Sequence, residues 1–215
     1  MKYSKARGSY GNAGFFVYRT MLKSELRKIF LERRRLTTTA ECEEMSGRIR
    51  DRFFRDTDLA EVRTLHTFIP ILRFNEVDTW AIVRSIWSDH PQITTVTSVS
   101  SADPAELAHA EFGPETEFAV SKFGIKEPVG ERSVQPTAID VVLVPLLCID
   151  ERGFRVGYGK GLYDRFLAKC RPDCLKIGLS LFAPIDAIDD IRGHDVALDR
   201  CITAEETLIF EPLNR

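Results

Sequence analysis

The most constraining feature of the sequence is a nearly continuous apolar run from Ile139 to Leu147 that leads directly into a glycine-rich segment. Such a run is typical of a strand in a parallel sheet, where helices cover both faces. Glycines follow at 157, 159 and 161, and residues 161–170 have the pattern of a helix. A buried strand, a glycine-rich turn and a helix in this order predict an α/β layer fold.

The remaining hydrophobic periodicity favours the same architecture. Amphipathic helices are expected over residues 19–35 and from the threonine cluster at 37–39, which can supply an N-cap, to about Arg55. A third helical segment is expected over 76–89, and the stretch 100–136 is predicted to be mostly loop with a short hairpin. Further strands are expected over 62–69, 93–99, 176–182 and 200–203, the last before a polar tail. Strands alternating with helices predict a mostly parallel sheet flanked by helices.

The chain length sets the domain organisation. A chain of 215 residues fits one large domain or two small ones, and the absence of an internal repeat or low-complexity linker favours one. The N-terminus is polar, glycine-rich and basic, without the apolar core of a secretory signal. We therefore expect a flexible leader at residues 1–17 and a single α/β domain over 18–215.

Charge, hydropathy and cysteine content exclude several functions. Thirty Lys and Arg against 32 Asp and Glu leave a formal net charge of -2, so the overall field attracts neither nucleic acid nor an anionic membrane. The longest apolar run falls well short of the roughly 20 residues that a membrane span requires. Five scattered cysteines give no paired or zinc-binding pattern, which favours reduced thiols in a cytoplasm.

The segment from Asp150 to Arg165 carries the chemical signal. Its alternating glycines allow backbone N–H groups to approach an anion closely, and the start of the following helix adds positive potential. Arg155 and Lys160 place cations beside this phosphate cradle, and Asp164 is suited to a divalent ion that bridges phosphate oxygens. The other interpretation is a flexible turn whose charges face water. The spacing matches neither a Walker loop nor GxGxxG, so it does not name the ligand.

Several ordered motifs surround this segment. Together they extend over most of the chain. The motifs are Lys-x-x-x-Arg at Lys23 and Arg27, Glu-Val-x-Thr at Glu76–Thr79, Glu-Pro at Glu127–Pro128, a strand ending at Pro145, the signature Arg155, Gly157, Gly159, Gly161, Tyr163, Asp164 and Arg165, and a later element at His194, Asp195, Asp199 and Thr203. With these motifs the sequence resembles the 5-formyltetrahydrofolate cyclo-ligase family, also called methenyltetrahydrofolate synthetase. The resemblance implies a Rossmann-like, mostly parallel sheet in a single domain.

The resemblance also implies an activity: an ATP-dependent ring closure of 5-formyltetrahydrofolate to 5,10-methenyltetrahydrofolate, with release of ADP and phosphate and with Mg²⁺ as the metal. The formyl oxygen attacks the γ-phosphate, and a folate nitrogen then attacks the phosphorylated imidate. By similarity, Glu76 and Tyr158 bind the folate, Asp164 and Asp195 bind Mg²⁺, and Lys160 and Tyr163 are catalytic. The ATP-binding residues implied are Lys23, Arg27, Arg155, Gly157, Tyr158, Gly159, Lys160, Gly161, Leu162 and Tyr163.

Each role has a plainer structural alternative. Lys23 and Arg27 lie in a helix rich in basic residues and are as compatible with a solvated face as with phosphate contact. Glu76 is also compatible with a first-turn acid that the helix dipole favours, and His194 with orienting its neighbour or capping a turn. Two departures from the family pattern bear on the folate end: Leu162 replaces one of a pair of aromatic residues, and Val96–Val99 lacks the usual Pro and basic residue.

Two other functions compete with the cyclo-ligase interpretation. One is a catalytically weak relative that binds folate or nucleotide in a sequestering or regulatory role, suggested by the departures above. The other is a sugar-phosphate isomerase or acyl-CoA transferase on a related sheet, since the fold by itself does not fix function. We expect a cytoplasmic monomer whose partners are the small-molecule substrates 5-formyltetrahydrofolate and ATP.

Overall fold

The computed structural model describes residues 21–121, 124–130 and 132–211, so the predicted leader at 1–17 lies outside the described residues. The helices are α1 (Lys23–Leu36), α2 (Thr39–Asp56), α3 (Trp80–Asp89) and α4 (Leu162–Leu167), with short 3-10 turns at Leu72–Phe74 and Pro136–Ala138. The strands are β1 (Thr64–Thr67), β2 (Thr94–Ser100), β3 (Leu107–Phe112), β4 (Phe118–Val120), β5 (Lys126–Pro128), β6 (Val141–Pro145), β7 (Cys148–Ile149), β8 (Arg155–Val156), β9 (Leu175–Leu179), β10 (Arg200–Ile202) and β11 (Thr207–Ile209).

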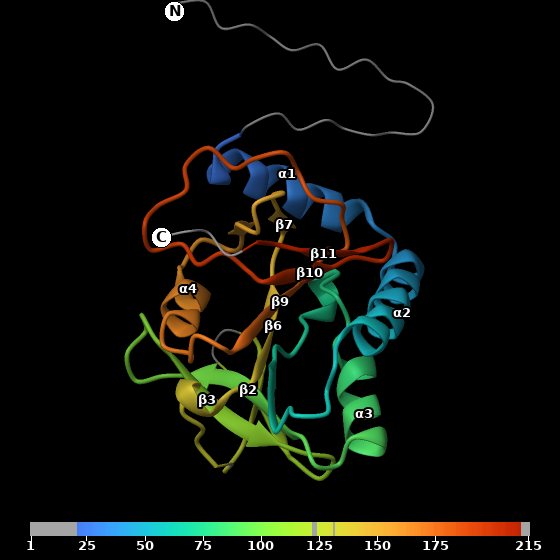
Figure 1. Cartoon of the computed structure of the whole chain (residues 1–215), viewed down its shortest axis with the longest axis vertical. Coiled ribbons are helices and arrows are strands. Elements are labelled where there is room, and N and C mark those ends of the chain that lie inside the picture. Colours follow the sequence, from blue (N-terminus) through green and yellow to red (C-terminus); the bar gives the residue numbers. More distant parts are fainter. Residues whose placement is uncertain (1–20, 122–123, 131, 212–215) are drawn as a thin grey trace, which may run out of the picture.

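The main sheet has seven strands in the order β11-β10-β9-β6-β1-β2-β3. The five central strands are parallel, and each edge strand runs antiparallel to its neighbour. Figure 1 shows α2 and α3 on one side of the sheet, α4 on the other, and α1 across one end. This is the predicted Rossmann-like α/β domain with a mostly parallel sheet.

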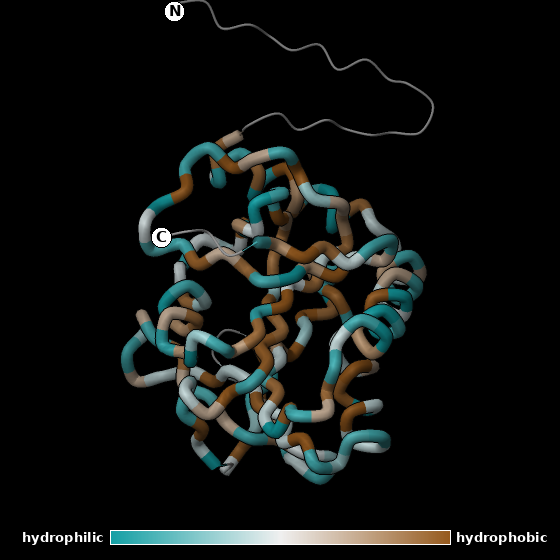
Figure 2. The backbone as a smooth tube through the Cα atoms, in the orientation of Figure 1, coloured by the Kyte–Doolittle hydropathy of each residue, from teal (hydrophilic) through white to brown (hydrophobic). Residues whose placement is uncertain are grey.

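The core forms on both faces of β6, as its apolar run predicts. Val141 and Leu143 pack into a cluster with α2 and α3, whereas Val142 and Val144 pack into a second cluster with α4. Successive residues of a strand point to opposite faces, so a strand covered on both sides must be apolar throughout. The central strands accordingly run through Figure 2 as its most hydrophobic segment. Each fully buried valine or leucine contributes about 1.5–3 kcal/mol to folding.

Strand order reverses between β1 and β6. The unit β1–α3–β2 extends to one side of β1, and β6–α4–β9 extends to the other side. At such a switch point the loops leaving the carboxyl ends of two adjacent parallel strands diverge and leave a crevice, which is where open α/β sheets bind ligands. The loop after β1 carries Glu76, and the chain after β6 carries the glycine-rich segment.

The structure corrects several predicted boundaries. The third helix begins at Trp80 rather than at residue 76, because Asn75 adopts φ 48° and the Thr79 hydroxyl donates to the Phe68 carbonyl oxygen at 2.7 Å. The stretch 100–136 contains the predicted short hairpin, β4–β5, but also β3, an edge strand of the main sheet. A further strand, β11, follows β10 where a polar tail was expected.

Two other features agree with the expectations drawn from composition and capping. Thr38 caps α2: its hydroxyl accepts from the Glu41 N–H at 3.2 Å while the Glu41 carboxylate accepts from the Thr38 N–H at 2.8 Å. None of the helices in the described ranges combines the length and apolar character that crossing a membrane requires.

Candidate active site

The glycine-rich segment is built on a small hairpin rather than on a single turn. β7 and β8 pair antiparallel, and Gly153 between them adopts φ 83°, a left-handed conformation that L side chains rarely adopt. The chain leaves β8 at Val156 and enters α4 through Gly161 at φ 66°. The loop of residues 157–161, called the glycine loop below, is therefore held at both ends by backbone geometry.

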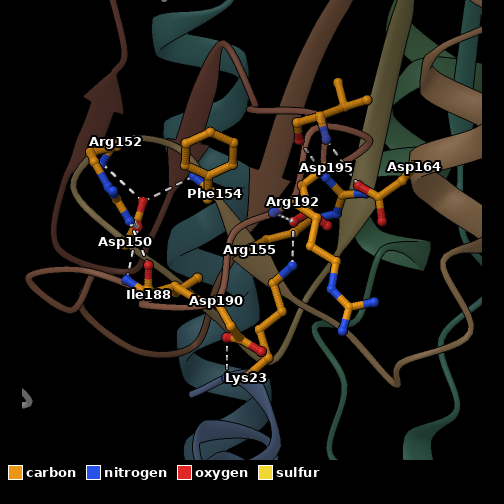
Figure 3. Close-up of polar contacts among 11 residues, drawn as sticks. Lys23, Asp150, Arg152, Phe154, Arg155, Asp164, Ile188, Asp190, Arg192 and Asp195 are labelled. Atoms are coloured by element: carbon orange, nitrogen blue, oxygen red, sulfur yellow. Dashed lines mark hydrogen bonds and ion pairs between the residues drawn. The ribbon is translucent and has the colours of Figure 1, made fainter. Parts of the chain in front are cut away.

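Helix α1 lies against the glycine loop through its basic face. Arg27 Nε donates to the Gly157 carbonyl oxygen at 2.8 Å, and Lys23 Nζ pairs with Asp195 Oδ2 at 2.5 Å. The Lys23 backbone N–H at the start of α1 donates to Asp190 Oδ1 at 2.7 Å (Figure 3). Lys23 and Arg27 thus contact the predicted site, and the alternative of a purely solvated face is wrong.

The signature residues Arg155 and Asp164 form a buried pair. Arg155 Nη2 donates to Asp164 Oδ1 at 2.9 Å, and Arg155 Nη1 donates to the Val196 carbonyl oxygen at 2.7 Å. The Val196 N–H also donates to Asp164 Oδ1, at 3.1 Å (Figure 3). Arg155 therefore ties β8, α4 and the 192–196 segment together, a position more internal than that of a cation at the open edge of the cradle.

A cavity of about 530 Å³ opens beside this pair, within the size range of small-molecule sites. Its lining comes from the glycine loop, α4 and the 192–196 segment. The residues are Gly159, Lys160, Gly161, Asp164, Arg165, Ala168, Gly193, His194, Asp195 and Val196. The cavity brings together two basic side chains, two carboxylates and the backbone groups of glycines, which is the chemistry that binds a phosphate chain with a divalent ion.

Each of the two carboxylates of the cavity already binds protein groups through one of its oxygens. Partial burial raises the pKa of Asp195, but hydrogen bonds from Lys23 and from the Arg192 N–H outweigh burial and hold the pKa below its usual value. Both contacts of Asp195 reach Oδ2, and both contacts of Asp164 reach Oδ1. Within the described ranges, no three His, Cys, Asp or Glu side chains gather as a metal site. Two carboxylates fit Mg²⁺, which takes its other ligands from water and substrate phosphates.

The predicted folate-binding residues, Glu76 and Tyr158 of the glycine loop, contact each other. The Tyr158 hydroxyl donates to Glu76 Oε1 at 2.6 Å, and the Ile71 N–H donates to Glu76 Oε2 at 2.8 Å. Glu76 is buried and precedes α3 by several residues, so the interpretation as a first-turn acid is wrong. Burial and the adjacent Glu76 carboxylate raise the pKa of Tyr158, which keeps its hydroxyl a proton donor.

Tyr163 and Leu162 occupy the first turn of α4. The Tyr163 ring lies 6.2 Å from that of His66 and 5.9 Å from that of Phe166. Burial raises the pKa of the Tyr163 hydroxyl, so this group is also neutral near neutral pH. The Lys160 side chain lines the cavity and is exposed to solvent, and it also interacts with another group of the protein.

Two features of the site were missed in the sequence. Gly193 and Val196 line the cavity because the 192–196 segment folds back onto α4, which no local motif predicts. Arg34 lies beside Glu76 and Tyr158, and the signal for it was present: Leu26, Phe30 and Arg34 recur at intervals of four and are the buried residues of α1. A charged residue in the apolar position of a helical repeat needs a buried partner.

Comparison with known proteins decides the family. Residues 19–203 match the profile of the 5-formyltetrahydrofolate cyclo-ligase family. The chain belongs to this family. The 5-formyltetrahydrofolate cyclo-ligase of Escherichia coli K12 is 29% identical over 139 residues, which are 63% of this chain and 74% of the relative.

Solved structures agree with the fold of the cyclo-ligase family. The solution structure of the Aquifex aeolicus 5,10-methenyltetrahydrofolate synthetase superposes with a TM-score of 0.76 at 25% identity, covering 91% of this chain and 96% of that one. The Mycoplasma pneumoniae synthetase gives a TM-score of 0.67 at 23% identity, covering 86% and 99%. In this cyclo-ligase fold, five of the predicted residues line the cavity, namely Gly159, Lys160, Gly161, Asp164 and Asp195, whereas Tyr158 pairs with Glu76.

Proposed function

We propose that this chain catalyses the ATP-dependent cyclisation of 5-formyltetrahydrofolate to 5,10-methenyltetrahydrofolate, releasing ADP and phosphate. The observation that carries the proposal is the charged cavity at the carboxyl edge of the parallel strands, formed by the family's signature residues. Membership of an ATP-dependent ligase family supplies the reaction.

The cavity is the proposed phosphate site. Lys160 and the backbone of Gly159 and Gly161 would contact the triphosphate, with Lys23 and Arg27 reaching the same loop from α1. Arg155, Gly157, Tyr158, Leu162 and Tyr163 complete the predicted ATP-binding set, Arg155 by holding the walls of the site in place. Because Lys23 is paired with Asp195, phosphate binding would exchange one anionic partner of Lys23 for another.

The proposed metal ligands are Asp164 and Asp195, which present carboxylate oxygens to the cavity. Bound there, Mg²⁺ would neutralise phosphate charge and orient the γ-phosphoryl group. Lys23 and Arg155 keep the two carboxylates in place through their ion pairs.

Glu76 and Tyr158 are the proposed folate contacts. Each Glu76 oxygen accepts one hydrogen bond from the protein, at Oε1 from Tyr158 and at Oε2 from Ile71. A carboxylate oxygen can accept two, so both oxygens can still receive a pair of N–H donors of a pterin ring. The Tyr158 hydroxyl, which donates to Glu76 Oε1, would lie beside the bound pterin.

The reaction requires the protein mainly to position the two substrates and to neutralise charge. The formyl oxygen must meet the γ-phosphate in line, and the developing phosphoryl charge must be neutralised. Lys160 and Tyr163 are the proposed catalytic residues, Lys160 as the exposed cation at the cavity and Tyr163 as a neutral hydroxyl at the start of α4.

The test is a spectrophotometric assay of the purified protein with 5-formyltetrahydrofolate, ATP and Mg²⁺, following the near-ultraviolet absorbance of the methenyl product. We expect product formation that requires ATP and stops when Mg²⁺ is chelated. Calorimetric binding of folate without turnover would instead favour the sequestering relative, which no present observation supports. Turnover of another substrate without ATP would favour an isomerase or transferase.

We further propose that the enzyme is a cytoplasmic monomer that needs small-molecule partners only. All five cysteines are free thiols in the structure, which supports a reducing compartment. Light scattering of the purified protein checks the monomer against the chain mass of 24.4 kDa.

A further inference from the structure

Three consecutive arginines near the end of α1 have three different environments. Arg35 pairs with Glu32 at the surface, at 2.7 Å, and Arg33 lies over the Phe30 and Phe182 rings. Arg34 is 5% exposed and points into the molecule, where the helix repeat otherwise places Leu26 and Phe30. A buried guanidinium is costly unless it is paired and hydrogen-bonded.

The partners of Arg34 come from three separate elements of the site. Arg34 Nη2 donates to the Leu146 carbonyl oxygen just after β6, and Arg34 Nη1 donates to the Tyr158 hydroxyl at 3.2 Å. Arg34 Nη1 also forms an ion pair with Glu76 Oε1 at 3.6 Å, and both side chains are 6% exposed. Tyr158 bridges the two, since its hydroxyl accepts from Arg34 and donates to Glu76.

The loop that carries Glu76 is also tied to the end of α1. Asn75 Nδ2 donates to the Arg34 carbonyl oxygen at 2.8 Å and to the Thr37 carbonyl oxygen at 2.7 Å. Backbone and side chain of Arg34 therefore both fix the position of the Glu76 segment. A carboxylate with so little exposure requires paired, hydrogen-bonded partners.

We propose that Arg34 is a positioning residue for folate binding, holding the Glu76 carboxylate oriented for the donors of the pterin ring. This inference rests on the proposed function, in which Glu76 is the folate contact. Arg34 itself touches neither substrate in this scheme. It acts through Glu76 and through the bridging hydroxyl of Tyr158.

Arg34 supplies the cation among the groups that face Glu76. The titratable and charged groups that face Glu76 are Arg34 from α1, Cys42 from α2, Tyr158 from the glycine loop and Tyr163 from α4. Burial raises the pKa of Cys42, Tyr158 and Tyr163, so these three are neutral near neutral pH. Arg34 therefore supplies the positive charge beside Glu76 Oε1, and Arg34→Met removes it.

The experiment compares the KM for 5-formyltetrahydrofolate and for ATP in the wild type, Arg34→Met, Arg34→Lys and the control Arg35→Met. For Arg34→Met we expect the folate KM to rise roughly 10- to 100-fold, the range for loss of a hydrogen-bonded charge, with the ATP KM little changed. Arg34→Lys recovers part of the folate KM because it retains the charge, and Arg35→Met matches the wild type.

Other outcomes would separate failure of this inference from failure of the proposed function. A lower thermal stability of Arg34→Met with both KM values unchanged would make Arg34 a purely structural residue and overturn the inference. If Arg34→Met does not fold, Arg34→Lys carries the test, because it must still raise the folate KM selectively. A wild type that binds 5-formyltetrahydrofolate without turnover contradicts the proposed reaction, and calorimetric affinities of the same variants then decide the role of Arg34. A wild type that does not bind this folate overturns both.

Discussion

Asp164 has two tasks at the level of a single residue, and they can be tested separately. It neutralises the buried Arg155 guanidinium at 2.9 Å and it lines the cavity as a proposed Mg²⁺ ligand. Asp164→Asn keeps an oxygen for the Arg155 and Val196 donors but removes the charge. We expect kcat to fall by about 100-fold and the free energy of unfolding to fall by about 1–3 kcal/mol, from turnover assays and urea denaturation.

The matched control for Asp164→Asn is Glu106→Gln, which removes a carboxylate from a pair with Lys169 at the surface. Exposed pairs contribute about 0–1 kcal/mol, so this variant should keep both turnover and stability. Full turnover of Asp164→Asn across a range of Mg²⁺ concentrations would remove Asp164 from the metal site.

The predictability of the site differs from residue to residue for a physical reason. Lys160 and Asp164 stand in one short motif whose spacing already indicates phosphate and metal chemistry, and the structure brings both to one cavity. Glu76, Tyr158 and Arg34 are far apart in the sequence and meet because β1 and β6 are neighbours in the sheet. Their pairing depends on tertiary packing, which a single sequence does not encode locally.

At the level of elements, the glycine loop contains a natural matched pair. Gly159 adopts φ 94°, and a Cβ there would lie 3.0 Å from Arg27 Cζ, whereas a Cβ on Gly157 would meet nothing within 4 Å. Left-handed conformations cost L residues about 1–2 kcal/mol. We expect Gly159→Ala to lower the free energy of unfolding by about that amount and, by displacing Arg27, to raise the KM for ATP. Gly157→Ala should leave stability nearly unchanged, as urea denaturation of both would report. Equal stability of the two variants would contradict the conformational argument.

The sequence predicts those helices and strands correctly whose structure depends on a single local interaction. The apolar run of β6 and the capped α2 were predicted because burial and capping act within a few residues. β3 was missed because Glu111 and His109 break its apolar pattern, and its place is decided by pairing with β2. The start of α3 was missed because Val77 continues the helical period although Asn75 and Thr79 hold that segment as a loop.

At the level of the whole molecule, two buried histidines lie between the main sheet and α4. His66 on β1 and His109 on β3 have ring centroids 5.1 Å apart, and both contact Phe166 of α4, at 4.7 and 4.0 Å. Burial, and then the charge of Lys169, lower the pKa of His109 to about 4. Burial, and then His109, lower the pKa of His66 well below its usual value. Both rings are therefore neutral in the folded protein at neutral pH.

This arrangement predicts acid sensitivity of the fold between about pH 6.5, the unfolded-state pKa of histidine, and about pH 4. In that window the unfolded chain binds two protons that the folded chain does not, so the free energy of unfolding falls as the pH falls, by up to ~2.7 kcal/mol per pH unit. Urea denaturation between about pH 7 and 5 measures the slope. His109→Gln, which removes one of the two buried histidines, should reduce it by about half. Equal slopes for the wild type and His109→Gln would mean that His109 is protonated in the folded state, which its packing against Phe166 and His66 opposes.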